Sequence, residues 1–314
     1  MAAPAFDLLV LGDVNPDLVL AGGDVTPAFG QAEHLVDEAE LTLGGSGAIT
    51  AAGAARLGLR VAMAGVVGDD LFGRWAREQL EGRGVDTGGL VTDPDVSTGV
   101  SVILSGDRDR AILTHLGTIA SLRGERVDPA LLRKTRHVHV PSYFLQRALA
   151  PDLPALFAHV HDAGGTTSVD PNWDPTEAWD GGLRELLPLT DVFLPNDIEV
   201  RRVARTSDLD RASTELARSA GLVVVKAGAE GALAATRDGL TRVAARPIHV
   251  VDTTGAGDSF DAGFLAGWLG GRDLEAALDL ANACGAISCA ALGGIDAQPT
   301  LAEAEAFILQ ESLA

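Results

Sequence analysis

The sequence predicts an α/β fold with a mostly parallel central sheet that carries helices on both faces. Short apolar runs that close on glycine, such as FDLLVLG at residues 6–12, are typical of strands buried on both faces. The middle third of the chain alternates strand-like and helix-like segments, which is the rhythm of βαβ units. Near the C-terminus, residues 252–260 (DTTGAGDSF) join a β-rich run to a helical pattern through a glycine turn.

The composition agrees with one large α/β domain and a small accessory element. A chain of 314 residues, 46% of them hydrophobic, can bury a substantial core. The formal net charge is −20 and no basic cluster offsets it, so we expect neither nucleic acid nor an anionic membrane as a partner. Lys134 and Lys226 are the only lysines. Positive potential for an anionic ligand must therefore come from helix N-termini, a few arginines and bound cations.

The cysteines and histidines suggest no metal or disulfide. Cys284 and Cys289 are five residues apart in a helical pattern and do not share a face, which predicts free thiols in a reducing cytoplasm. No basic region precedes Asp7, so we expect no secretory signal, and the apolar run at 281–295 is too short and interrupted to cross a membrane. Two His-x-His pairs lack a supporting carboxylate or cysteine and are interpreted as surface or strand histidines. They are His137 with His139 and His159 with His161.

The first strand is predicted at residues 6–12, and polar residues follow its carboxyl end. Ligands bind at that end of open parallel sheets, which makes Asn15 and Asp17 candidates for holding ligand hydroxyl groups. An Asn-Pro turn with a capping aspartate is an alternative interpretation of the same residues. Residues 19–43 are acidic and lack a sustained helical period, which favours a loop.

A glycine pair opens the first predicted helix. Gly44 and Gly45 allow backbone N–H groups to approach a ligand, and the helix that follows, to residues 57–58, directs its N-terminus to the same place. The elements expected next are a strand at 60–65, a turn and helix from 65–73, a hairpin of strands 98–104 and 110–114 around residues 105–109, a strand at 137–140, a helix at 150–163, a strand at 167–170, a helix ending at 187 and a strand at 192–194.

Polar residues also follow the later strands. Asn196 and Glu199 are three residues apart on one helix face and could hold a hydrated Mg²⁺. The same pair is a capping box, and spacing alone does not decide between the two interpretations. Residues 222–225 predict a buried strand, and the turn that begins at Lys226 follows it. Lys226 could reach a phosphate or could lie in solvent at the strand end.

The glycine turn at 252–260 is the strongest candidate for chemistry. After a predicted strand at 248–251, it leaves the first N–H groups of a helix unpaired, which favours a phosphate or a developing negative charge. Asp258 beside that site could accept a proton from a hydroxyl, as an ionised, weak base. An ordinary turn with an acidic cap is the alternative. The chain has no Walker loop, and Thr50 stands where a Gly-x-Gly-x-x-Gly motif would need its last glycine.

These residues resemble a known family. DTTGAGDSF at 252–260 resembles the C-terminal signature of the ribokinase-like (PfkB) carbohydrate kinases, and residues 44–58 resemble their N-terminal signature. The resemblance extends over nearly the whole chain. It implies a ribokinase-like α/β domain at 1–13, 46–94 and 119–314, and a small β-sheet lid at 14–45 and 95–118 that excludes water from the reaction and pairs two subunits into a homodimer.

The resemblance also implies roles for individual residues. Asp258 would be the catalytic base, and the amides of Gly255, Ala256 and Gly257 the anion hole. The acceptor would contact Asn15, Asp17, Gly44, Gly45, Ile49 and Asp258. ATP would contact Asn196, Lys226, Gly228, Glu230, Gly231, Gly257 and Asn282. Mg²⁺ would lie near Asn196 and Glu199, and a monovalent cation such as K⁺ near Asp252, Thr254, Ser288, Ala291 and Gly293.

Two departures from the family pattern concern the acceptor. Ile49 replaces an asparagine that contacts the acceptor, and residues 116–119 (LGTI) lack another asparagine of the lid. An apolar side chain cannot replace those hydrogen bonds, so the pocket is expected to be less polar than that of a plain ribose kinase. The sequence thus predicts ATP-dependent phosphorylation of a sugar's primary hydroxyl. A nucleoside kinase, or a sugar- or nucleotide-binding protein without turnover, is the alternative.

Overall fold

The structure is a computed structural model that describes residues 4–106 and 110–311. Over these residues the main body contains a nine-stranded sheet in the order β13-β12-β11-β10-β9-β8-β1-β4-β5. Its pairings are parallel except for the two made by β12, which are antiparallel. The predicted fold class is confirmed. The strands are β1 (Phe6–Leu11), β4 (Val61–Gly68), β5 (Asp86–Asp93), β8 (Thr135–Val140), β9 (Thr166–Val169), β10 (Val192–Phe193), β11 (Leu222–Lys226), β12 (Ala232–Ala235) and β13 (Leu240–Val243).

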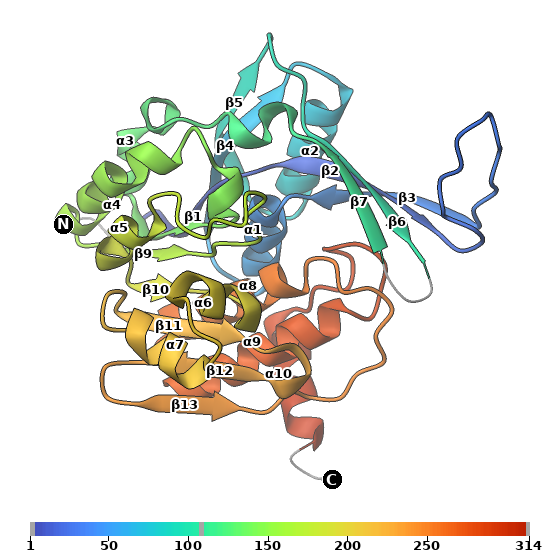
Figure 1. The fold of residues 1–314 in the computed structure, drawn as a ribbon. Coiled ribbons are helices and arrows are strands. Elements are labelled where there is room, and N and C mark those ends of the chain that lie inside the picture. Colours follow the sequence, from blue (N-terminus) through green and yellow to red (C-terminus); the bar gives the residue numbers. More distant parts are fainter. Residues whose placement is uncertain (1–3, 107–109, 312–314) are drawn as a thin grey trace.

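Helices cover both faces of this sheet (Figure 1). They are α1 (Ser46–Arg56), α2 (Leu71–Gly82), α3 (Pro129–Arg133), α4 (Leu153–Asp162), α5 (Leu183–Leu186), α6 (Asp197–Ala204), α7 (Leu209–Leu216), α8 (Ala256–Leu269), α9 (Leu274–Ser288) and α10 (Leu301–Glu311). Because successive strand residues point to opposite faces, Leu8 and Val10 join a core formed with α1, α2, α8, α9 and α10. Leu9 and Leu11 join the other core, formed with α3 to α7.

A separate four-stranded sheet projects from the side of the main body (Figure 1). Its order is β3-β2-β6-β7, with β2 and β6 parallel and the other pairs antiparallel. The predicted hairpin is present as β6 and β7, whereas residues 107–109 of its turn lie outside the described residues. The expected loop at 19–43 is shorter, because β2 and β3 occupy its two ends. The strands are β2 (Asn15–Ala21), β3 (Glu38–Gly44), β6 (Val100–Ser105) and β7 (Arg110–His115).

One predicted element is wrong and another is short. Residues 248–251 form no strand, because the sheet ends at β13 and Pro247 has no N–H to donate, and the side chains of Val250 and Val251 are about half exposed. The helix expected to end at residue 187 is present as α5, but it is a single turn. Gly181 and Gly182 just before it have positive φ angles of 55° and 84°, which interrupt a helix.

Both cysteines and the first of the two His-x-His pairs are buried. Cys284 and Cys289 are buried and form no disulfide. His137 and His139 point from β8 into the core and share the hydroxyl of Ser168, at 2.7 Å from each ring. Burial lowers the pKa of His139 to about 3, so the ring is neutral. Among the described residues no three or more His, Cys, Asp or Glu side chains form a metal-binding group. No helix in residues 4–106 and 110–311 has the length and apolarity of a membrane span.

Candidate active site

The glycine turn ends at the N-terminus of α8. Gly255 caps this helix with φ of 70°, and a Cβ there would lie 2.6 Å from the backbone of Gly294, so only glycine fits. Within residues 4–106 and 110–311, the N–H groups of Gly255 and Gly257 have no acceptor, and that of Ala256 reaches Thr253 O at 3.3 Å. Unpaired N–H groups at the positive end of a helix dipole form an anion-binding corner. The sequence analysis predicted unpaired N–H groups at this turn.

Asp258 lies in the first turn of α8, next to these N–H groups. Burial raises its pKa to about 7, and the carboxylates of Asp170 and Asp13 act in the same direction, whereas Lys226 and the Ser46 hydroxyl lower it. The sequence-based expectation of a weak, fully ionised base therefore needs correction. A carboxylate with a pKa near 7 is a stronger proton acceptor than an ordinary aspartate.

The N-terminus of α1 faces the same region. Asp13 receives hydrogen bonds from the N–H groups of Ser46 (3.2 Å) and Gly47 (3.0 Å) at the start of this helix. The Ser46 hydroxyl in turn accepts a hydrogen bond from the side chain of Asn172 at 3.2 Å, which connects the segment after β9 to α1. Gln298 then joins α1 to α8, because its side-chain amide donates to Ile49 O at 2.9 Å and to Ser259 Oγ at 3.1 Å.

The predicted acceptor residues of the small sheet come together. Asn15 and Asp17 are buried, and the Asn15 amide donates to Asp17 at 2.9 Å. Their side chains occupy the space that a Cβ on Gly44 or Gly45 would need, so residues with a side chain at these two positions would clash with them. Ile49 is 3% exposed and packs behind the turn, with its Cγ2 atom 3.1 Å from where a Cβ on Gly255 would lie.

A buried ion cluster lies beneath the turn. The Lys226 ammonium is 2.7 Å from Asp170 and 3.1 Å from Asp261. It also lies 3.8 Å from the place where a Cβ on Gly257 would be. The suggestion that Lys226 lies in solvent is therefore wrong. Burial alone would raise the pKa of Asp170, but the Lys226 charge and the hydrogen bonds that the carboxylate accepts together hold that pKa below the usual value. Burial raises the pKa of Asp261.

The Asn196 and Glu199 pair forms a complete capping box at α6. Asn196 Oδ1 accepts the N–H of Glu199 at 2.9 Å, and the Glu199 carboxylate accepts the N–H of Asn196 at 2.8 Å. Glu199 is 4% exposed, and burial, followed by Asp170, raises its pKa to about 7. Asn196 bridges to Lys226 through the backbone, so the box lies beside the ion cluster.

A cavity of about 640 Å³ opens next to the turn. Five of the seven residues predicted to contact ATP line this cavity: Lys226, Gly228, Gly231, Gly257 and Asn282. The other two, Asn196 and Glu230, do not line it. The Asn282 amide donates to the carbonyl groups of Val243 and Ala244 at 3.3 and 3.2 Å, which closes one wall.

Side-chain hydrogen bonds join some of the residues predicted for a monovalent cation. The Asp252 carboxylate binds the N–H of Thr254 at 2.9 Å and that of Gly293 at 3.0 Å, so it joins the two segments. Ser288 instead donates to Gly285 O in its own helix at 2.9 Å. Ala291 makes no side-chain hydrogen bond by its chemistry.

Four residues of the site escaped the sequence reasoning: Asp13, Ser46, Asp261 and Gln298. Asp261 could have been found, because it stands three residues after Asp258 on the same helix face. Asp13 follows β1 at its carboxyl end, where ligand-binding residues gather. The position of Gln298, 249 residues from Ile49, left no local signal.

Comparisons with known proteins show which family the chain resembles over nearly its whole length. A family model described as "pfkB family carbohydrate kinase" matches residues 5–301. The ATP-dependent ribose-1-phosphate kinase of Halopiger xanaduensis is 34% identical over 309 residues, covering 96% of this chain and 97% of that protein. An E. coli protein described as a Ribokinase II, solved in complex with ATP and Mg²⁺, is 27% identical with a TM-score of 0.85, over 97% of this chain and 99% of that chain. The adenosine kinase of Sinorhizobium meliloti is 26% identical with a TM-score of 0.84, over 98% of this chain and 99% of that chain.

Proposed function

The chain belongs to the pfkB family of carbohydrate kinases, and from this premise we propose that it transfers the terminal phosphoryl group of ATP to a primary hydroxyl of a sugar. The observation that carries the proposal is the position of Asp258, in the first turn of α8 beside three backbone N–H groups. The carboxylate suits a proton acceptor and the N–H groups suit a phosphoryl group, so an alcohol and a phosphate can meet there.

In the proposed reaction Asp258 takes the proton from the acceptor hydroxyl. The hydroxyl oxygen forms a bond to the γ-phosphorus, and the bond from that phosphorus to the β-phosphate oxygen breaks, with its electron pair leaving on ADP. The amides of Gly255, Ala256 and Gly257 would stabilise the negative charge on the transferring group. Asn15 and Asp17 would orient the sugar, since both offer side-chain oxygens at the carboxyl end of the sheet.

ATP would occupy the cavity beside the turn, with Gly228 and Gly231 allowing close approach of the backbone. A magnesium ion would lie near Asn196 and Glu199. Because the capping box already uses their oxygens, these residues would hold it through water. When bound, Mg²⁺ would neutralise charge on the phosphates. Asp252 and Thr254 remain the proposed contacts of a monovalent cation such as K⁺.

Replacing Asp258 by asparagine tests the assignment. We expect Asp258→Asn to bind ATP nearly as well as the wild type and to lower kcat by roughly 10²-fold or more, the scale of general-base catalysis. Asp273→Asn is the matched control, because Asp273 caps the N-terminus of α9 away from the site. Undiminished turnover in Asp258→Asn would disprove the role of this residue.

A nucleoside kinase is the second candidate for the same site. Ile49 and the LGTI segment lack the two asparagines that the family pattern has at these places, and an adenosine kinase is among the similar structures. ADP release should be measured with ribose, ribose 1-phosphate, fructose and adenosine as acceptors. We expect turnover with a sugar. Activity confined to adenosine would favour the nucleoside kinase over the sugar kinase. Ligand uptake in calorimetry with no ADP from any acceptor would instead indicate a binding protein without turnover.

A further inference from the structure

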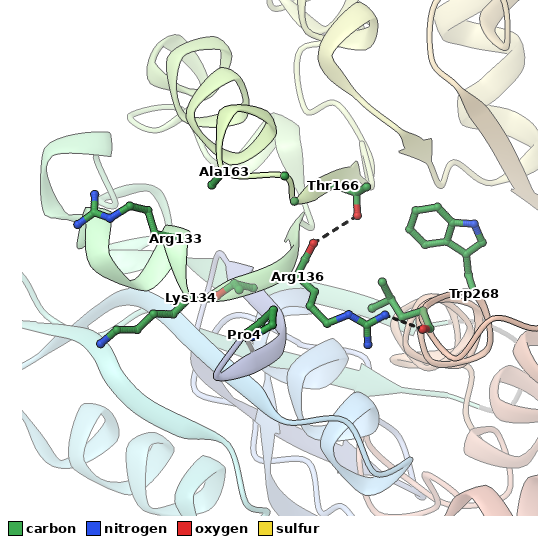
Figure 2. Close-up of a pocket in the computed structure, with 11 residues that line it drawn as sticks. Pro4, Arg133, Lys134, Arg136, Ala163, Thr166 and Trp268 are labelled. Carbon is green, nitrogen blue, oxygen red and sulfur yellow. Dashed lines mark hydrogen bonds between the residues drawn. The ribbon is translucent and has the colours of Figure 1, made fainter. Parts of the chain in front are cut away.

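A second cavity lies at the opposite end of the strands from Asp258. Its volume is about 760 Å³, within the range of roughly 300–1,000 Å³ that is usual for small-molecule pockets. The segments that line it meet at the amino ends of β1, β8 and β9 and at the C-terminus of α8 (Figure 2). The cavity is therefore separate from the candidate active site, which uses the carboxyl ends. Its lining comprises Pro4, residues 133–136, residues 163–166, Trp268 and Leu269.

The lining of this cavity is basic. Arg133, Lys134 and Arg136 contribute three positive charges, and no carboxylate lines it. Arg133 and Lys134 are exposed and make no ion pair within residues 4–106 and 110–311. Arg136 shares Asp7 with Arg60, at 3.3 and 2.9 Å, so one carboxylate faces two guanidinium groups. An excess of positive charge at one place is unusual in a chain whose net charge is −20.

One side of the cavity is a fixed aromatic ring. Trp268 meets the buried ring of His137 edge-on, with centroids 5.5 Å apart and planes at 78°. Figure 2 shows Trp268 on one side of the cavity and the side chains of Arg133 and Lys134 extending on the other. Arg136 reaches across between them and donates to Leu269 O at 3.0 Å. Long, flexible cationic side chains can fold over an anion, while a fixed indole offers a surface to a planar ring.

We propose that this cavity binds a small phosphate-bearing molecule of mononucleotide size. Arg133 and Lys134 would make charge-assisted contacts with the phosphate, and Trp268 would contact the ring. The proposal does not depend on the acceptor or on turnover at Asp258.

AMP is the probe, with inorganic phosphate and adenosine for comparison. The donor and acceptor pockets of the active site are first saturated with a non-hydrolysable ATP analogue and with the acceptor that supports ADP release, so that neither AMP nor adenosine can bind there. Binding is then followed by calorimetry and by tryptophan fluorescence. We expect saturable binding of AMP that weakens as salt rises, weaker binding of phosphate, and none of adenosine.

The double variant Arg133→Ala/Lys134→Ala tests the two cations. Both side chains are exposed, so their removal should leave the fold intact, which circular dichroism would confirm. We expect AMP to bind at least about tenfold more weakly to this variant. Arg218→Ala/Arg237→Ala removes two exposed arginines that line neither cavity and should bind AMP like the wild type. Absence of saturable AMP binding, equal binding of adenosine, or equal affinity in the two double variants would overturn the proposal.

Discussion

Single residues at the turn differ in charge from what their types suggest. Asp258 and Glu199 both have pKa values raised to about 7, chiefly by burial. Lys226 works against both shifts, because its ammonium lies beneath the turn and between two carboxylates. Lys226 thus moderates the proton affinity of the proposed base, a role that neither sequence interpretation of this residue, a phosphate contact or a solvent-exposed side chain, had suggested.

The raised pKa of Asp258 predicts how turnover depends on pH. The base must be unprotonated to accept a proton, so kcat should fall about tenfold for each pH unit below about 7 and level off above it. An ordinary aspartate, with a pKa near 3.8, would give a flat profile over the same range. The measurement is the pH profile of kcat at saturating ATP and acceptor. A rate independent of pH between roughly 5 and 7 would contradict the raised pKa.

The stability of the folded chain should respond to the same group. A carboxyl whose pKa is higher in the folded state binds more protons when folded, so it lowers stability as pH rises from about 4 towards 7. Asp258→Asn should therefore unfold at a higher denaturant concentration than the wild type at neutral pH, and the gap should close near pH 4. If the wild type and Asp258→Asn had equal unfolding midpoints at both pH values, the pKa of Asp258 would not be raised in the folded state.

At the level of elements, the N-termini of α1 and α8 meet at one place and are joined by Gln298. The glycines in these turns are not interchangeable. Gly255 needs a positive φ and has backbone in the way of a Cβ, whereas Gly257 is helical and a Cβ there would only touch Lys226, at 3.7 Å.

Gly255→Ala should therefore be destabilising where Gly257→Ala is not. We expect Gly255→Ala to lose about 1–3 kcal/mol of unfolding free energy, the cost of a side chain in the left-handed region. Gly257→Ala is the internal control and should be neutral or gain up to about 1 kcal/mol, because alanine favours a helix. Urea denaturation of the two variants measures the difference. A similar midpoint for both would show that the turn can adjust.

The sequence predicted the elements that carry a local signal. The apolar runs of β1 and β11 and the glycine turn before α8 depend on neighbouring residues, and the structure places them as expected. The run at 248–251 is equally rich in residues that favour strands. It forms no strand, because the sheet ends at β13 and offers it no edge to pair with. The cluster of Lys226, Asp170 and Asp261 joins residues 35 and 56 positions from the lysine, which spacing cannot reveal.

At the scale of the whole molecule, the small sheet leaves apolar side chains uncovered along both of its edges. On β3 and β7, at its two edges, Leu41, Ile112 and Leu113 are 42%, 51% and 61% exposed. Unpaired strand edges with exposed apolar residues are surfaces that bind another chain. A second copy of the chain is the partner that the family resemblance suggests.

We expect the protein to form a homodimer through the small sheet. Ile112→Asp/Leu113→Asp would put charges on its β7 edge, so the variant should sediment as a single chain where the wild type sediments as two. Leu71→Asp is the control, because Leu71 is 71% exposed but lies on α2. A wild-type protein that sediments as one chain at all concentrations would disprove the dimer.

Because Lys134 and Lys226 are the only lysines, amine-reactive labelling of the protein should be selective. Lys226 is 12% exposed and held as a charged ammonium by two acids, so it is a poor nucleophile toward amine-reactive reagents. Lys134 is exposed at the rim of the second cavity. Apart from the α-amino group, an activated ester would thus attach a dye almost exclusively at that rim, which gives a uniformly labelled protein without any engineered handle.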